Sequence, residues 1–262
     1  MRPVIGLRRT TSNVVVHIPH AGLLLPRRLR LPTIADLDDE THLMADLQVD
    51  LVADALDTAI TTTGGTPPNR VTNTVSRLVM DPERFDGPDE EMDAVGMGII
   101  YTHTHDGRPL YDPPLTPAET EQRKHAYYQP YGEAFADLVD DVLAHHDRCL
   151  IIDLHSYATE PLPFERHPAD RRPPVCLGHE PYHAPNTLPL AATLKTAGFA
   201  TTTNEPYSGS YVPARHWRTN PRVRSVMVEI RKDQYLHPDT STRPAQILAL
   251  GQALAAWLSM AP

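Results

Sequence analysis

The stretch that decides the fold class is Cys149-Leu150-Ile151-Ile152-Asp153-Leu154-His155-Ser156. Its first four residues are apolar and predict a short buried strand, and the polar residues that follow mark the place where this strand ends. In α/β proteins, the carboxyl ends of parallel strands form the edge of the sheet where ligands bind. The stretch therefore predicts an α/β protein in which His155 lies at such an edge.

Two further segments resemble this one. Val14-Val15-Val16-His17-Ile18-Pro19-His20 is a strand-like run that leads to an imidazole, and Val226-Met227-Val228-Glu229-Ile230 carries a carboxylate among aliphatic residues. Pro19 and the glycine after Ala21 end the first of these runs. Three strands with such polar residues near their ends predict one shared site.

The rest of the chain alternates between the two kinds of pattern. Strands are predicted at 70–75, 173–177, 199–203 and 223–230, and helices at 46–59, at 188–197 and from 244 onward. Another helix carries the apolar stripe Tyr128, Tyr131, Phe135, Leu138 and Val142, with Pro130 at its start or at a kink. This alternation predicts a single domain over residues 1–262, with a mixed, mainly parallel sheet and helices on both faces.

Composition limits the partners of the chain. With 262 residues and a formal charge of −9, it lacks the clustered cations that nucleic acids or anionic membranes require. No segment approaches the ~20 apolar residues of a membrane span or the pattern of a signal peptide. Cys149 and Cys176 lie in apolar surroundings and are expected to be reduced thiols. We therefore expect a soluble cytoplasmic protein, and nothing in the pattern indicates its oligomeric state.

His20 and His155 are candidate metal ligands, and Asp46 is a candidate third ligand. A hydrolytic zinc ion binds about three protein nitrogen or oxygen atoms and keeps one position open. Each histidine has an alternative as a hydrogen-bonded surface or core residue. Asp46 has two alternatives, as the N-cap of the helix predicted at 46–59 or as part of its solvated acidic face.

Glu229 is a candidate general acid/base. A carboxylate between Val228 and Ile230 is costly to bury unless it is paired, bound to a ligand or catalytic. The alternative is a glutamate on an edge strand that faces solvent, because Met227 and Glu229 share one face of the strand. Both interpretations are open at this stage.

Arg77 and Arg84 are candidate substrate-binding residues. A guanidinium can bind a carboxylate with two hydrogen bonds or stabilise an oxyanion. The alternative is an ordinary salt bridge, since Asp81, Glu83 and Asp86 are close in sequence. The prolines that cluster at 109–117, 161–174 and 181–189 predict long loops that shape a binding site. His103-Thr104-His105 offers two imidazoles on one side of a strand, but a solvated loop is the favoured interpretation.

The order of these segments resembles the N-formylglutamate amidohydrolase family. The matching pieces are Pro19-His20-Ala21-Gly22, the Asp46 segment, Ser76-Arg77, Asp81-Pro82-Glu83-Arg84, Asp153-Leu154-His155-Ser156 and Val228-Glu229-Ile230. These proteins are zinc hydrolases whose fold is similar to that of zinc carboxypeptidases and aspartoacylases. The resemblance therefore implies a zinc-carboxypeptidase-like (phosphorylase/hydrolase-like) fold and an enzyme that cleaves linear amide C–N bonds.

The resemblance also implies a role for each candidate residue. It implies that His20, Asp46 and His155 bind one Zn²⁺ per chain and that Glu229 is the general acid/base. Arg77 and Arg84 would contact the scissile carbonyl and a substrate carboxylate, and the loop from Gly209 to His216 would bring Tyr211 and Arg215 to the pocket.

The implied reaction is the hydrolysis of a small anionic N-acyl amino acid, with N-formylglutamate giving formate and glutamate. The zinc ion would polarise the carbonyl and supply hydroxide, and Glu229 would carry the proton. Alternatives are a carboxypeptidase-like or γ-glutamyl amidase activity, and a non-catalytic zinc- or ligand-binding protein. One residue departs from the family pattern: Glu83 replaces a neutral asparagine, and this acid would repel a carboxylate substrate or neutralise Arg84.

Overall fold

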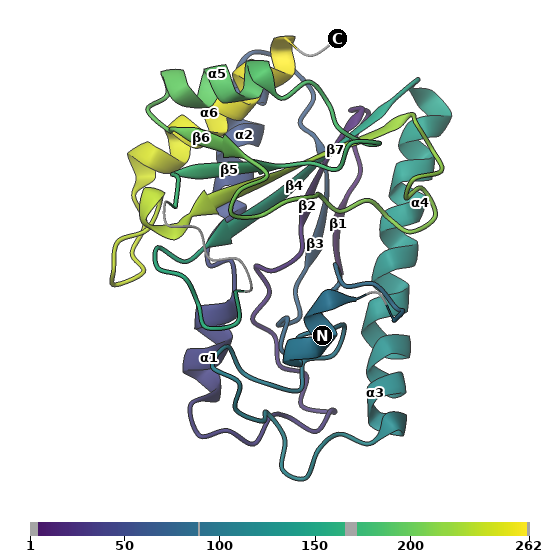
Figure 1. Ribbon diagram of the computed structural model, residues 1–262. Helices are drawn as coiled ribbons and strands as arrows, with labels where there is room; N and C mark the ends of the chain where they lie inside the picture. Colours follow the sequence, from purple (N-terminus) through teal and green to yellow (C-terminus); the bar gives the residue numbers. More distant parts are fainter. Residues whose placement is uncertain (1–4, 89, 166–171, 261–262) are drawn as a thin grey trace.

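The apolar runs of the sequence pair into one sheet. In the computed structural model, which describes residues 5–88, 90–165 and 172–260, the sheet has seven strands in the order β1-β3-β2-β4-β7-β5-β6 (Figure 1). The strands are β1 (Ile5–Arg8), β2 (Val14–Ile18), β3 (Asn69–Asn73), β4 (Cys149–Tyr157), β5 (Val175–Gly178), β6 (Thr201–Thr203) and β7 (Val223–Arg231). This sheet confirms the predicted α/β class.

The centre of the sheet is parallel and its margins are not. β3, β2, β4 and β7 run in one direction, while β1 pairs antiparallel with β3 and β5 pairs antiparallel with β7. The central strands β2, β4 and β7 are buried along almost their whole length, which explains their continuous apolar sequences. Their carboxyl ends therefore lie together at one edge of the sheet.

Helices cover both faces of the sheet. α2 (Asp50–Thr62), α5 (Leu188–Thr196) and α6 (Pro244–Met260) pack on one face through a core that includes Val16, Leu56 and Leu254. α4 (Gln129–His145) packs on the other face, where Phe135 and Leu138 contact the layer that contains Val15 and Ile151. Figure 1 shows this division, with α2, α5 and α6 on one side of the twisted sheet and α4 on the other.

Glycine at position 251 permits the close approach of α6 to α2. A Cβ atom there would lie 2.6 Å from the backbone of Ala55, which is shorter than real contacts allow. The two helices share one of the most extensive contacts in the fold, so this glycine has a packing role.

Shorter elements shape the region beyond the carboxyl ends of the strands. They are α1 (Leu37–Met44), η1 (Glu91–Val95), α3 (Pro117–Arg123) and η3 (Lys232–Gln234), together with η2 (Lys124–Tyr128), a π-helical turn that joins α3 to α4. A separate hydrophobic cluster lies here, and its buried members are Met44, Leu78, Met97, Tyr101, Leu110 and Tyr111. No helix in the described ranges combines the length and apolar character of a membrane span.

The structure corrects the start of one predicted helix. The helix predicted at 46–59 begins at Asp50, so Asp46 lies in the connection between α1 and α2 and is not an N-cap. The N-cap position is Val49, whose side chain forms no capping hydrogen bond. Pro130 lies in the first turn of α4, directly after the π-helical turn, in agreement with the predicted start or kink. The elements β1, α1 and α3 were not predicted.

Candidate active site

A cavity of about 470 Å³ opens at the carboxyl ends of the central strands. His20 lies two residues beyond β2, while His155 and Glu229 lie near the ends of β4 and β7. The ionisable or hydroxyl-bearing residues that line the cavity include His20, Asp46, Arg77, Glu83, Arg84, Asp153, His155, Tyr211, Glu229 and Lys232. The parallel topology therefore brings together the strand ends that the sequence analysis singled out.

His20, Asp46 and His155 meet at one point. The two Nδ1 atoms are 3.2 Å apart, and Asp46 Oδ2 lies 3.2 Å from His155 Nδ1 and 3.7 Å from His20 Nδ1. All three side chains are buried. Asp46 is held in place because its backbone N–H donates to the carbonyl of His20 and its Oδ1 accepts a hydrogen bond from Ser156. Asp46 is thus not part of a solvated helix face.

These three atoms fit the ligands of one metal ion. Donors bound to a tetrahedral zinc ion at about 2.0–2.1 Å lie roughly 3.3–3.4 Å from one another. The observed separations of 3.2, 3.2 and 3.7 Å bracket that value. Burial would raise the pKa of Asp46, but hydrogen bonds with His155 and His20 hold it below its ordinary value. A carboxylate and two imidazoles are also donors that a divalent ion accepts.

The far nitrogens of both rings support the same interpretation. Nε2 of His20 lies 2.9 Å from Asp81 Oδ1, and Nε2 of His155 lies 3.1 Å from Asp153 Oδ1. An ionised carboxylate only accepts hydrogen bonds, so in the neutral rings Nε2 carries the proton and the Nδ1 lone pair is free. Carboxylate partners of this kind orient metal-binding histidines. Two facing lone pairs repel each other unless a cation lies between them.

Asp153 belongs to a buried hydrogen-bond chain. Its Oδ1 accepts from His17 Nδ1 at 2.8 Å, and its Oδ2 accepts from the backbone N–H of Tyr211 at 2.8 Å. The ring of His17 contacts Phe135 and Tyr211. The sequence analysis did not assign a role to His17 or Asp153, and it considered Asp81 only as a salt-bridge partner of the arginines. The signal for Asp153 was its position two residues before His155, which places both side chains on one face of β4.

Glu229 faces the cavity from the strand next to His155. The register of β4 and β7 places Glu229 opposite His155, and β7 lies between β4 and β5, so the edge-strand alternative is wrong. Its side chain is 9% exposed, and within the described ranges its Oε2 has no hydrogen-bond partner. Burial raises the pKa of Glu229 to about 8. The result is a buried carboxyl group at the cavity that takes up a proton more readily than an ordinary glutamate does.

Arg77 and Arg84 both line the cavity and share one buried carboxylate. Arg77 Nη2 donates to Asp81 Oδ2 at 2.8 Å, and Arg84 Nη2 lies 3.4 Å from the same oxygen. The salt-bridge alternative is therefore realised in part, with Asp81 and not with Asp86. Burial would raise the pKa of Asp81, but Arg84, His20 and Arg77 hold it well below its ordinary value.

Tyr211 lies at the cavity, whereas Arg215 does not. Tyr211 lines the cavity wall and packs on Phe135. Arg215 is half exposed and binds Asp137 and Asp140 on α4, outside the cavity lining. The prediction that Arg215 lines the pocket is wrong. Its guanidinium binds two carboxylates one turn apart on α4, which are distant from Arg215 in sequence and lie at the surface.

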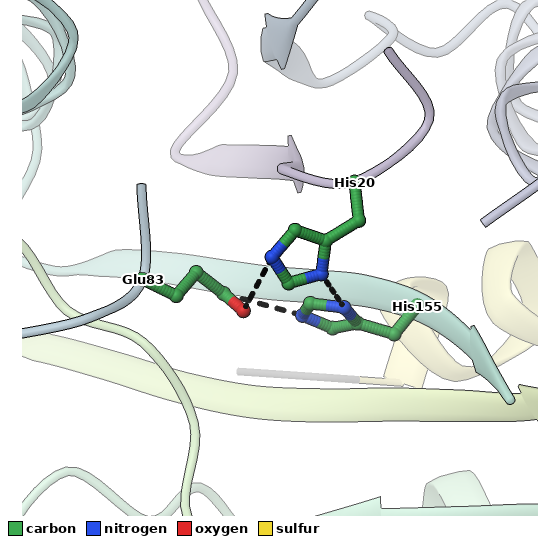
Figure 2. A group of neighbouring side chains, drawn as sticks. All are labelled: His20, Glu83 and His155. Atoms are coloured by element: carbon green, nitrogen blue, oxygen red, sulfur yellow. Dashed lines mark hydrogen bonds and ion pairs between the residues drawn. The ribbon is translucent and has the colours of Figure 1, made fainter. Parts of the chain in front are cut away.

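Glu83 and Lys232 complete the polar lining. Glu83 Oε1 lies 3.2 Å from His155 Nε2 and its Oε2 lies 3.6 Å from His20 Nε2. Figure 2 shows the two rings facing each other, with the Glu83 carboxylate beside their far nitrogens. Lys232 Nζ donates to the carbonyl of Leu43, and burial lowers its pKa. Lys232 was missed because a lysine three residues after Glu229 carries no motif.

The histidine-containing loops do not form a second site of the kind considered for His103-Thr104-His105. His103 Nδ1 bonds Thr102, and His105 Nδ1 lies 2.6 Å from the buried Glu40, so the two rings have separate partners. His183 is buried and bonds backbone groups. His167, in the proline-rich region, lies outside the described residues.

Fold and cavity together define an α/β enzyme whose polar side chains converge at the carboxyl ends of parallel strands. The chain belongs to the N-formylglutamate amidohydrolase family, whose model matches residues 12–236, and it is an amidohydrolase. It is similar in structure to an N-formylglutamate amidohydrolase from Ralstonia eutropha JMP134, with 22% identity, a TM-score of 0.79 and 98% coverage of both chains. It is also similar to a gene product from Agrobacterium tumefaciens, with 18% identity, a TM-score of 0.69 and coverage of 98% of this chain and 94% of the other. No protein of curated function matches the chain.

Proposed function

We propose that this protein is a zinc-dependent hydrolase of small anionic N-acyl amino acids and that it works as one catalytic domain over residues 1–262. The observation that carries the proposal is the convergence of His20 Nδ1, His155 Nδ1 and Asp46 Oδ2 within 3.7 Å of one another. N-formylglutamate is the reference substrate, since the family and the Ralstonia protein are named for its hydrolysis. The two buried free cysteines support a reducing compartment, for which we propose the cytoplasm.

His20, Asp46 and His155 would hold one Zn²⁺. When bound there, the ion would polarise a substrate carbonyl and lower the pKa of a water molecule toward ~7. Asp81 and Asp153 keep the two imidazoles in the tautomer that presents Nδ1 to the cation.

Glu229 acts as the general acid/base. Its carboxylate accepts a proton from the attacking water as the new C–O bond forms at the amide carbon. The same carboxyl group then gives this proton to the amide nitrogen as the C–N bond breaks. The products are a carboxylate and an amine, which are formate and glutamate when the substrate is N-formylglutamate.

The two arginines bind the negative charges of the substrate. Arg77 lines the cavity, and its guanidinium stabilises the oxyanion that develops on the carbonyl oxygen. Arg84 binds the substrate carboxylate. Asp81 fixes both guanidinium groups through one carboxylate oxygen, so the two arginines and His20 are positioned together.

The first test is turnover of N-formylglutamate by purified protein, before and after chelation and again after addition of zinc. We expect activity to disappear with the chelator and to return with the metal. Turnover that resists complete metal removal would exclude the metal from the reaction. Carboxypeptidase-like and γ-glutamyl substrates in the same assay test the alternative amidase activities.

The second test is Glu229→Gln, with Glu133→Gln, an exposed change on α4, as its matched control. We expect zinc binding to persist and kcat to fall by about 10²–10⁴-fold, as removal of a general acid/base does. A protein that binds zinc normally but turns over no amide even as wild type would instead be a binding protein.

A further inference from the structure

The charges around the cavity are unevenly balanced. Among the described residues, the lysine and arginine side chains that line it are Arg77, Arg84 and Lys232. Asp81 binds both guanidinium groups, and the Glu83 carboxylate lies in the same lining, next in sequence to Arg84. Glu91, Asp153 and Glu165 also line the cavity, so the carboxylates outnumber these three cations even when Asp46 and Glu229, which would offset a divalent metal ion, are set aside. One substrate carboxylate can bind the guanidinium of Arg84, whereas a second would be buried among these acids without a cation of its own.

Part of the cavity lining is apolar. This part is formed by Met44, Met92, Leu162 and Phe164. Met44 belongs to the hydrophobic cluster that contains Leu78, Met97 and Tyr101, and the other three pack against that cluster. We call these four residues the apolar wall. They come from the end of α1, from η1 and from the loop after β4. A formyl group and a glutamate side chain have little apolar surface to place against this wall, whereas an alkyl or thioether chain would remove it from water.

We propose that the preferred substrate is an N-acyl amino acid with a single carboxylate and an apolar substituent, which lies against the apolar wall. Glu83 and the wall act together: the acid disfavours a second carboxylate, and the wall favours a hydrocarbon chain. The inference rests on the proposed function, and it concerns which member of the N-acyl amino acid class the enzyme selects. The apolar substituent belongs either to the amino acid side chain or to the acyl group.

Zinc-loaded wild-type enzyme tests the ranking with four substrates. N-formyl-L-glutamine has the shape of N-formyl-L-glutamate without its second charge, N-formyl-L-methionine adds an apolar side chain, and N-hexanoylglycine carries its apolar chain on the acyl side. We expect kcat/KM to rise from glutamate to glutamine to the better apolar substrate, by about tenfold or more overall. The higher of the two apolar substrates identifies which end of the substrate meets the wall. The highest kcat/KM for N-formylglutamate would overturn the proposal.

Two variants separate the contribution of Glu83 to selectivity from that of the apolar wall. Glu83→Gln should reduce the ratio of kcat/KM for N-formyl-L-glutamine to that for N-formyl-L-glutamate about tenfold, because a negative charge near the second substrate carboxylate is removed. This ratio is independent of any loss of zinc affinity, and Glu133→Gln should leave it unchanged. Met92→Gln keeps the size of the side chain and should lower the preference for the apolar substrate about fivefold. Unchanged ratios in both variants would contradict the proposal.

Binding distinguishes this inference from the proposed function. Glu229→Gln can be titrated calorimetrically with the same substrates without turnover, and the apolar substrate should bind more tightly than N-formylglutamate. Absence of turnover in the wild type together with that binding order would refute the hydrolase and leave the selectivity intact. Turnover with the opposite binding order would refute the selectivity alone.

Discussion

Two regions of the cavity differ in how their residues are positioned. They are the floor, which we define as His20, His155 and Glu229, and the apolar wall. His155 and Glu229 on the floor stand on adjacent parallel strands, and His20 follows the strand on the other side of β4. Their positions are set by backbone hydrogen bonds. Met92, Leu162 and Phe164 of the wall stand on a short 3₁₀ helix and an irregular loop, where packing and local turn hydrogen bonds set their positions. The catalytic residues therefore lie on or next to the rigid strands, whereas the residues proposed to select the substrate lie on segments that tolerate substitution.

The largest effect is expected from a change in the floor. His155→Ala removes one donor of the three-atom site, and we expect zinc content to fall to background and turnover to fall by about 10³-fold or more. Metal analysis and initial rates measure both quantities. His145→Ala, an exposed histidine at the end of α4, is the matched control and should change neither. Full zinc content in His155→Ala would refute the site.

A smaller effect is expected from a change at Asp81, the hydrogen-bond partner of His20. Asp81→Asn replaces the carboxylate that holds His20 Nε2 at 2.9 Å with an amide. We expect zinc affinity to fall by about 10–100-fold, as loss of such a partner does, while the thermal unfolding midpoint shows whether the fold persists. Competition with a chromophoric chelator gives the affinity. Unaltered affinity in a folded variant would mean that the floor does not depend on this partner.

A modest effect is expected in the wall. Phe164→Ala should raise KM for N-formyl-L-methionine roughly threefold to tenfold, with kcat and zinc content little changed, because only contact area is lost. Steady-state kinetics separate the two constants. A large fall in kcat would show that the wall also positions the reacting atoms, and the contrast between floor and wall would fail.

The smallest effect is expected outside both regions. Arg215→Ala removes an exposed guanidinium that binds Asp137 and Asp140 on α4, so kcat/KM should stay within about twofold of the wild type. The same kinetic assay checks this. A marked rise in KM would return Arg215 to the substrate pocket.

The strands that carry the floor were also the part of the fold that the sequence predicted best. The buried strands β2, β4 and β7 were predicted because long apolar runs leave few alternatives, and their topology brought His20, His155 and Glu229 to one edge. The start of α2 was predicted too early because Asp46 has the sequence character of an N-cap, while its carboxylate is engaged by His155 and Ser156.

Two kinds of feature could not be predicted from the local sequence: elements with a weak periodic pattern, and side chains whose partners are distant in sequence. The edge strand β1 is half-buried and has a glycine, and the short helix α1 has mixed polarity, so neither produces a strong periodic signal. Arg215 was misplaced because its two partners lie more than seventy residues earlier in the sequence. Lys232 reaches the cavity through a hydrogen bond to Leu43, 189 residues away.

The pairing of β4 with β7 has a mechanical consequence. Residues opposite each other in adjacent strands are separated by about 4.8 Å, and this spacing is maintained by main-chain hydrogen bonds along nine consecutive pairs. His155 and Glu229 therefore cannot drift apart as single side chains on loops can. The carboxyl group needs no hydrogen bond of its own to stay in place, so little reorganisation energy is required when it takes up or gives away a proton.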